Sequence, residues 1–334
     1  MWYNIAMNRT AEQPRLGVID SVSAGFAVVS RNPWLIALPI LLDLGLWLGP
    51  KLSIRGLLAP LLSAMAATAA ASPEYQQASE LSRQLLEQTA ERLNLLSLLA
   101  NGLLGIPSLV AGQGPDLSAF AWGSGPVVDV RGLAEALGLA GLLILAGLLI
   151  GGIYVGFIGQ KVRGEPAPRF LRRAGRTWLR LVGLSGGLFM AGVALALPLA
   201  LLLALLSLFA PGAAAFGASL LLLLVVWVAV WLSLALFFAV PAIILDEVGV
   251  SAAIWRSVNI VGRNFWSTIG LILLGFFLNT GFSVIWQRLS ATLWGLVVSI
   301  IGNAYIGSGL VAATLVFYSD RRRRWLESPT TRKA

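Results

Sequence analysis

Apolar stretches long enough to cross a bilayer recur along the chain, separated by short polar and basic clusters. A transmembrane helix needs about 20 mostly apolar residues. The stretches lie at about 33–50, 137–160, 180–209, 218–245, 267–286 and 293–318. A soluble helical bundle would need a polar stripe on each surface helix, and none runs through residues 139–157 or 220–245. The pattern therefore predicts an all-α, polytopic integral membrane protein with about six transmembrane helices.

Residues 53–112 are harder to assign, because two further apolar runs flank an amphipathic stretch. Ser72, Pro73 and Glu74 are typical of a helix start, with a capping hydroxyl and a proline in the first turn. Apolar residues follow at helical spacing, with charges on the other faces. We expect residues 55–131 to form a helical extracytoplasmic insert on the membrane surface, within a single membrane domain that covers residues 1–334.

The distribution of positive charge predicts the orientation. With six spans, the side that holds both termini carries 18 basic and 7 acidic residues, whereas the other side carries 6 and 7, with Asp43 inside the membrane. Basic residues mark the cytoplasmic side. We therefore expect both termini, the loop at 161–180 and the basic tail at 319–334 to be cytoplasmic, with Arg321–Arg324 facing lipid. Anionic lipid headgroups are the expected partners of this face, and nucleic acid is not expected.

A short motif occurs twice and has a weaker echo. Arg31-Asn32-Pro33-Trp34 precedes the first span, Arg263-Asn264-Phe265-Trp266 precedes the fifth, and Arg176-Thr177-Trp178 precedes the third. Stretches compatible with a helix come before them, at about 17–30, 251–262 and 167–176. We interpret the chain as three helical hairpins, each led by a cytoplasmic interfacial helix with an arginine and a tryptophan at headgroup depth. The alternative is coincidence, since Arg and Trp flank many spans.

Few polar side chains lie inside the predicted spans. Asp43 is the only acidic one, and an ionisable group in the membrane is a candidate functional residue because its burial is costly. It could instead be a structural group hydrogen-bonded to Asn279 or Asn303, or be hydrated near the outer surface beside Lys51. Asn279, in the fifth span, and Asn303, in the sixth, could line a path with Asp43, although hydrogen bonds between helices are the commoner use of such groups. These three residues form our candidate intramembrane polar site.

The sequence lacks the residue types and motifs on which most enzyme mechanisms depend. There is no cysteine and no histidine, which excludes thiolate chemistry and removes the commonest metal ligand and general base. No motif pairs a nucleophile with a base. We expect no catalytic residue, no metal and no cofactor. Because Asp246 and Glu247 are adjacent and would point apart on a helix, we expect a helix cap or an ion pair with Arg256 or Arg263 there.

Small residues recur at four-residue spacing in three spans, which allows helices to approach closely. They are Gly147 with Gly151 and Gly152 with Gly156 in the second span, Gly183, Gly187 and Ala191 in the third, and Ala304, Ser308 and Ala312 in the sixth. This spacing indicates helix packing. It does not distinguish contacts within the chain from contacts with a partner subunit.

Two segments are similar to a prokaryotic membrane-protein family. Residues 241–247, continuing through 253–257 to 264–266, resemble the six-span membrane domain attached to some glycerophosphoryl diester phosphodiesterases and its stand-alone relatives. The ending Phe317–Arg323 resembles the close of that domain, where an aromatic residue and an aspartate precede basic residues. The resemblance covers about residues 160–325. It implies the six-span fold and the plasma membrane of a prokaryote, and it carries over no activity, because the catalytic barrel is a separate soluble domain.

Three classes of function remain open from the sequence. The first is a non-enzymatic accessory or scaffold subunit that packs against partner proteins or lipids. The second is a transporter or lipid-handling protein with a polar path near Asp43, Asn279 and Asn303. The third, an intramembrane enzyme, is the least supported, because only carboxylates, hydroxyls and lysine are available. We expect the first.

Overall fold

The computed structural model describes residues 16–58, 63, 80, 84, 94–100, 104–111, 126–164 and 173–327. It confirms an all-α, polytopic membrane architecture. Five apolar helical segments are each long enough to cross a membrane: α5 (Leu133–Arg163), α7 (Ala174–Phe209), the combined stretch Phe216–Asp246 of α8 (Pro211–Ala235) and α9 (Ala239–Asp246), α11 (Phe265–Leu289) and α12 (Leu293–Glu327). A sixth is obtained if α1 (Val18–Arg31) and the bent continuation through η1 (Pro33–Ile36) and α2 (Ala37–Leu48) count as one span.

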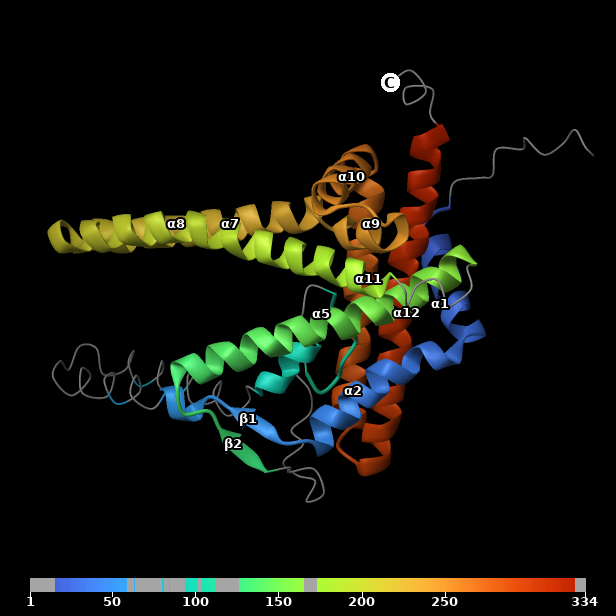
Figure 1. Ribbon diagram of the computed structural model, residues 1–334, viewed down its shortest axis with the longest axis horizontal. Helices are drawn as coiled ribbons and strands as arrows, with labels where there is room; N and C mark the ends of the chain where they lie inside the picture. Colours follow the sequence, from blue (N-terminus) through green and yellow to red (C-terminus); the bar gives the residue numbers. More distant parts are fainter. Residues whose placement is uncertain are drawn as a thin grey trace, which may run out of the picture.

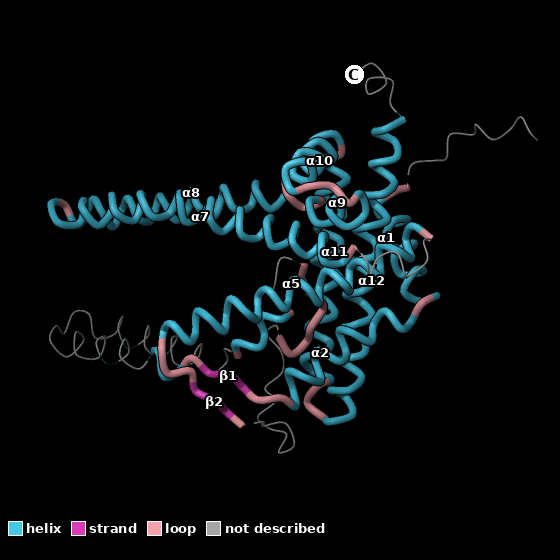
Figure 2. The backbone as a smooth tube through the Cα atoms, in the orientation of Figure 1, coloured by secondary structure: helices cyan, strands magenta, loops and turns pink. Residues whose placement is uncertain are grey.

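The helices diverge from a common end. There α9, the helix α10 (Val250–Arg263) and the last turns of α12 lie close together (Figure 1). We call this the Arg-rich end, because Arg163, Arg173, Arg180, Arg256 and Arg322 all make polar contacts with residues 245–247 there. From it α7 and α8 run outward as a paired hairpin, while α11 and α12 run in another direction (Figures 1 and 2). At its base the hairpin contacts α5, α9 and α10, whereas α12 contacts α1, α2, α5, α9, α10 and α11.

The two copies of the Arg-Asn-x-Trp motif have the same local structure. Helices α1 and α10 both have 14 residues, begin after an extended glycine (Gly17 and Gly249) and end at an asparagine outside the helical region. Asn32 donates its amide to the carbonyl oxygen of Val28 at 2.9 Å, and Asn264 donates to Ile260 at 3.0 Å. After Asn32 the chain turns by 96° into the span, and after Asn264 it enters α11. The two copies thus share a 14-residue helix that ends at an asparagine and is followed by an apolar helix, and the 96° bend is recorded for the first copy. The third lead-in, at about 167–176, lies largely outside the described residues, and its last residues already belong to α7.

The fourth span is broken, contrary to the single helix that the sequence suggests. Residues 236–238 form a turn between α8 and α9. Ser257 of α10 closes the break, because its hydroxyl donates to the carbonyl oxygen of Ala235 at 2.6 Å and accepts from the amide of Phe238 at 3.0 Å. Backbone groups freed inside a membrane need such partners. The break was not foreseeable from residues 236–238 themselves, which are uniformly apolar.

The insert is closed at its base by two short strands that the sequence did not predict. Strand β1 (Lys51–Ser53) pairs in parallel with β2 (Val127–Asp129), with Leu52 opposite Val128. Asn94 accepts from the amide of Leu52 at 3.0 Å and caps the short helix η3 (Leu95–Leu99) through the amide of Leu96 at 3.1 Å. Much of the predicted helical insert at 55–131 lies outside the described residues. Its described part at 104–111 returns to the helix bundle without forming a helix.

The most extensive packing between two helices joins α1 to α12. A methyl group placed on Gly25 would lie 2.3 Å from the amide nitrogen of Ala313, and one on Gly309 would lie 2.5 Å from the ring of Phe26. Such distances are too short for any side chain, so the two backbones touch. Because α1 packs on α12, the core of the protein gathers around α12, where Ala312, Leu315 and Phe317 are at most 1% exposed.

Candidate functional site

Asp43 lies in the middle of α2 and is completely buried. Its carboxylate accepts a hydrogen bond from the hydroxyl of Ser108 and two from backbone amides, at 3.0 Å from Leu109 and 3.1 Å from Val110. Ser108 in turn accepts from the amide of Ala111 at 2.9 Å. A carboxylate that accepts several backbone N–H groups is well stabilised without a basic partner. Both oxygens of Asp43 are therefore engaged in holding one turn of the insert.

The segment at 104–111 explains why α2 carries a carboxylate. This stretch is not helical, so its amides cannot bond within a helix ladder, and those that are buried need acceptors from elsewhere in the protein. Ile106 and Leu109 are 4% and 6% exposed. Pro107 lies so close to α12 that a methyl group on Gly307 would come within 2.2 Å of it. Asp43 supplies the acceptors that this buried turn needs.

The two asparagines of the predicted polar site lie elsewhere. Asn279 is exposed on α11, and Asn303 is half-buried on α12. Neither is a partner of the Asp43 carboxylate, which binds Ser108 and the following amides instead. The two asparagines, which the sequence offered as possible polar neighbours of Asp43, therefore do not hold its carboxylate. Nothing in the sequence pointed to Ser108, because it lies 65 residues away in an apolar stretch.

At the Arg-rich end, Asp246 is the centre of an ion-pair cluster. Its side chain has no exposed surface and pairs with Arg256, as predicted, and also with Arg322 of α12 at 2.7 Å. Tyr318 donates to the same carboxylate at 2.6 Å. The other predicted candidate, Arg263, instead lies over the ring of Trp325, 5.8 Å from its centre. The cluster ties α9 and α10 to α12.

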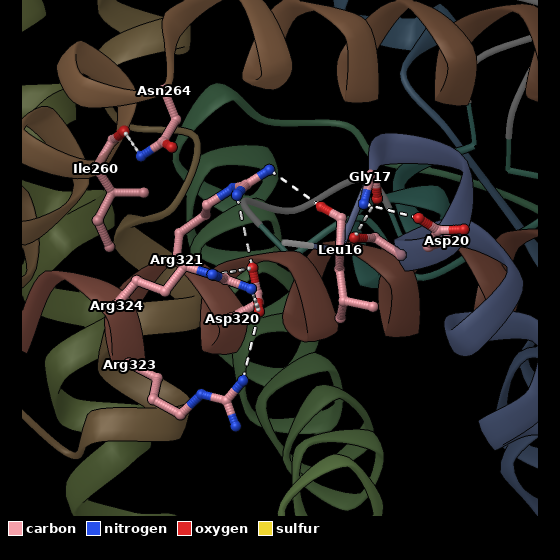
Figure 3. Close-up of polar contacts among 10 residues, drawn as sticks. Leu16, Gly17, Asp20, Ile260, Asn264, Asp320, Arg321, Arg323 and Arg324 are labelled. Atoms are coloured by element: carbon pink, nitrogen blue, oxygen red, sulfur yellow. Dashed lines mark hydrogen bonds and ion pairs between the residues drawn. The ribbon is translucent and has the colours of Figure 1, made fainter. Parts of the chain in front are cut away.

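The second aspartate of this end, Asp320, holds the remaining basic residues of the C-terminal cluster (Figure 3). Its carboxylate lies 3.1 Å from Arg324, 3.6 Å from Arg321 and 3.7 Å from Arg323. Arg321 also donates to the carbonyl oxygen of Leu16 at 3.1 Å and is only 8% exposed. Arg323, by contrast, keeps half of its side-chain surface exposed. Arg321 and Arg322 bind the protein itself, because Asp320 and Asp246 are buried beside them and require positive partners.

A polar cavity opens between the start of α7 and the α9–α10 link. It has a volume of about 150 Å³ and is lined by Arg173, Arg176, Thr177, Arg180 and Glu247. Arg173 pairs with the carboxylate of Glu247, and Arg180 donates to the backbone oxygen of Glu247 at 2.6 Å. Glu247 has a left-handed backbone (φ 54°), the single such non-glycine residue in the described ranges. Sequence reasoning placed these arginines at the membrane surface but did not foresee a cavity.

The three small-residue faces have different surroundings. In α12, Ala304, Ser308 and Ala312 are fully buried, and Ser308 shares a hydrogen bond of 2.7 Å with Tyr154 of α5. In α5, Gly147 contacts the backbone of Leu98 and Leu99, and Gly152 contacts Leu181. In α7, by contrast, Gly183, Gly187 and Ala191 are exposed. A methyl group added at Gly187 would meet no atom within 4 Å, whereas one at Gly183 would lie 3.5 Å from Val250 of α10. The chain itself therefore uses two faces and leaves the third open from Gly187 onward.

Comparisons of this chain with protein-family models, with curated proteins and with solved structures return no match.

Proposed function

We propose that this protein is a non-enzymatic accessory or scaffold subunit that receives a transmembrane helix of another membrane protein on its α7–α8 hairpin. The observation that carries the proposal is the contrast in burial among the spans. None of the most apolar 18-residue window of α7, or of the α8–α9 segment, is buried inside the protein, against 50% for α12. A long hairpin that leaves the bundle offers two helices to a neighbour.

The open face of α7 favours a helix as the occupant. Lipid chains solvate large apolar side chains as well as a protein does, so association in the bilayer depends on close contact and on small residues that permit it. Gly183, Gly187 and Ala191 supply such a face, and the equivalent faces of α5 and α12 are already covered by their own chain. The small-residue face of α7 therefore has the surface that a partner helix needs.

The orientation belongs to the same proposal. We place the protein in the plasma membrane of a prokaryote, with both termini and the Arg-rich end in the cytoplasm, where basic residues meet anionic headgroups. Ser251, at the start of α10, and Ala291, in the α11–α12 turn, are both exposed, and the chain has no cysteine of its own. With an impermeant thiol reagent on intact cells, Ala291→Cys is labelled and Ser251→Cys is not. The reverse pattern would contradict the orientation.

The alternative of a transport path has less support. A coupling carboxylate must reach a cavity and change partners, whereas both oxygens of Asp43 accept hydrogen bonds from the 108–110 turn. These contacts favour a structural Asp43. The Asp43→Asn variant separates the two readings, since transport requires the charge and packing does not.

The hairpin proposal is tested by photo-crosslinking in cells. A photoreactive amino acid at Met190, on the same face as Gly187, should give one discrete adduct with a membrane protein, because a partner helix lies there. The control position is Phe189. Its side chain is about as exposed as that of Met190, but it lies about 200° around the helix from Gly187. Gly187→Ile should abolish the Met190 adduct, and Gly192→Ile, off the face and equally open, should not. The chain has a mass of 35.4 kDa, and an adduct with twice this mass would identify a second copy of the chain as the partner. The same products from both positions, or none, would refute the proposal.

A further inference from the structure

The cavity at the start of α7 is the strongest candidate for a ligand site beyond the hairpin. We propose that it binds a phosphate group, held by Arg176 and Arg180 with the hydroxyl of Thr177 and the first amides of α7. If the phosphate belongs to a lipid headgroup, this site is part of the lipid contact proposed above for the Arg-rich end, and the proposal then rests on that contact. It stands without that contact where the phosphate is free.

Each acid at the Arg-rich end has more than one arginine beside it, and the cavity also holds an arginine without an acidic partner in the described part of the chain. Asp246 is matched by Arg256 and Arg322, and Asp320 by three arginines of its own helix. Glu247, the one acid among the described residues that line the cavity, faces Arg173. Among the described residues, Arg176 makes no hydrogen bond or ion pair, although it lines the cavity. Three arginines against one glutamate attract an anion.

The cavity is large enough for an oxyanion and is lined by suitable donors. A volume of about 150 Å³ far exceeds the 10–15 Å³ or so that one water requires. The guanidinium group offers paired N–H donors that match phosphate oxygens, which is why arginine recurs in phosphate sites. Arg180 is already oriented by its bond of 2.6 Å to the backbone of Glu247, so less freedom is lost when it binds.

Helix α7 adds a second attraction on the same side. The helix begins at Ala174, and the amide of Thr177 donates to the carbonyl oxygen of Arg173 at 3.0 Å, as expected of the first turn. The amides of residues 174–176 therefore have no partner within the helix. Free amides and the helix dipole at an N-terminus favour anions. Helix and arginines thus converge on one cavity, and Thr177, which is 4% exposed, provides a neutral donor in its wall.

The test uses the purified full chain in detergent, without any partner. Its affinity is measured for sodium phosphate and for dihexanoyl phosphatidic acid, a short lipid with a phosphate headgroup. We expect saturable binding that Arg176→Gln weakens about tenfold, because one charge-assisted contact is lost. The matched control is Arg323→Gln, which removes a positive charge from the same end at a half-exposed position (51%) outside the cavity, and should change the affinity little.

Each outcome decides a separate question. Equal affinity for both probes identifies free phosphate as the ligand chemistry, and a lipid affinity at least tenfold higher identifies a headgroup. No saturable binding, or binding that Arg176→Gln leaves unchanged, overturns the site. An equal loss in both variants also overturns it, and leaves only general attraction of the Arg-rich end for anions. Because no partner is present, failure of the hairpin proposal cannot produce any of these results.

Discussion

Half of the most apolar window of α12 is buried inside the protein, whereas none of the corresponding windows of α7 and α8–α9 is buried. Both regions consist of long apolar helices, and α7 and α8–α9 are in fact the more hydrophobic, with mean hydropathy of 2.6 and 2.8 against 1.8. In water the more apolar helix would be the more buried. In a bilayer the lipid solvates apolar side chains, so burial follows steric fit and hydrogen bonding. The core of this protein therefore lies where Gly25 and Gly309 allow helices to approach closely and where Ser308 bonds to a neighbouring helix.

The largest effect should come from a side chain placed between α1 and α12. Gly25→Leu forces the two backbones apart, because even a methyl group there would lie 2.3 Å from Ala313. We expect a loss above about 3 kcal/mol, beyond the usual cost of overpacking, and little monodisperse protein in size-exclusion chromatography. Gly187→Leu on the hairpin should leave the isolated chain unchanged. Equal behaviour of the two variants would show that the hairpin is packed as tightly as α12.

Removing the Asp43 acceptors should have the next largest effect. Asp43→Leu leaves the hydroxyl of Ser108 and two buried amides without partners, at a cost of about 3 kcal/mol or more, since each unsatisfied group costs roughly 1–3 kcal/mol. Asp43→Asn retains one acceptor oxygen and should cost about half as much. Thermal melting followed by fluorescence of the detergent-solubilised protein measures both. A fully stable Asp43→Leu protein would remove the structural role and reopen the transport alternative.

Shortening one leucine in each region compares their packing directly. Leu315 of α12 is 1% exposed and Leu223 of α8 is 68% exposed. Leu315→Ala should cost about 2 kcal/mol, mostly for the cavity it leaves, because transfer between lipid and protein contributes little. Leu223→Ala should cost about 0.5 kcal/mol or less in the isolated chain. A cost at Leu223 that matches that at Leu315 would indicate that the hairpin packs within the protein.

The smallest effect concerns single hydroxyl groups. Ser257→Ala removes both hydrogen bonds that close the break between α8 and α9 and should lower the free energy of unfolding by about 1–2 kcal/mol. Ser233 of α8 bonds only to Val230 of its own helix, at 2.8 Å, so Ser233→Ala should be nearly neutral. The difference is read from paired melting curves. If Ser233→Ala is the more damaging of the two, the break does not depend on α10.

The parts of the fold that were predictable depend on local chemistry. The six apolar stretches and the two Arg-Asn-x-Trp motifs could be recognised because span length and interfacial anchors depend on residues that are adjacent in the sequence. The ion pair of Asp246 with Arg256 was also near in sequence. The partners of Asp43 and the break at 236–238 were not visible, because each depends on a distant segment, 104–111 or Ser257, that satisfies backbone groups. The divergence of the hairpin was equally hidden, since hydropathy does not distinguish lipid from a neighbouring helix.

The fixed base of the insert makes it a separable module. Leu52 and Asn94 are joined by a hydrogen bond of 3.0 Å, so the chain leaves at residue 53 and returns at residue 94 to nearly the same place. A loop whose two ends are held together can change in length at small entropic cost, roughly 0.6 kcal/mol for each doubling. We therefore expect changes in the length of the 54–93 segment to cost little, provided that Asn94 and the 104–111 segment bound by Asp43 are kept.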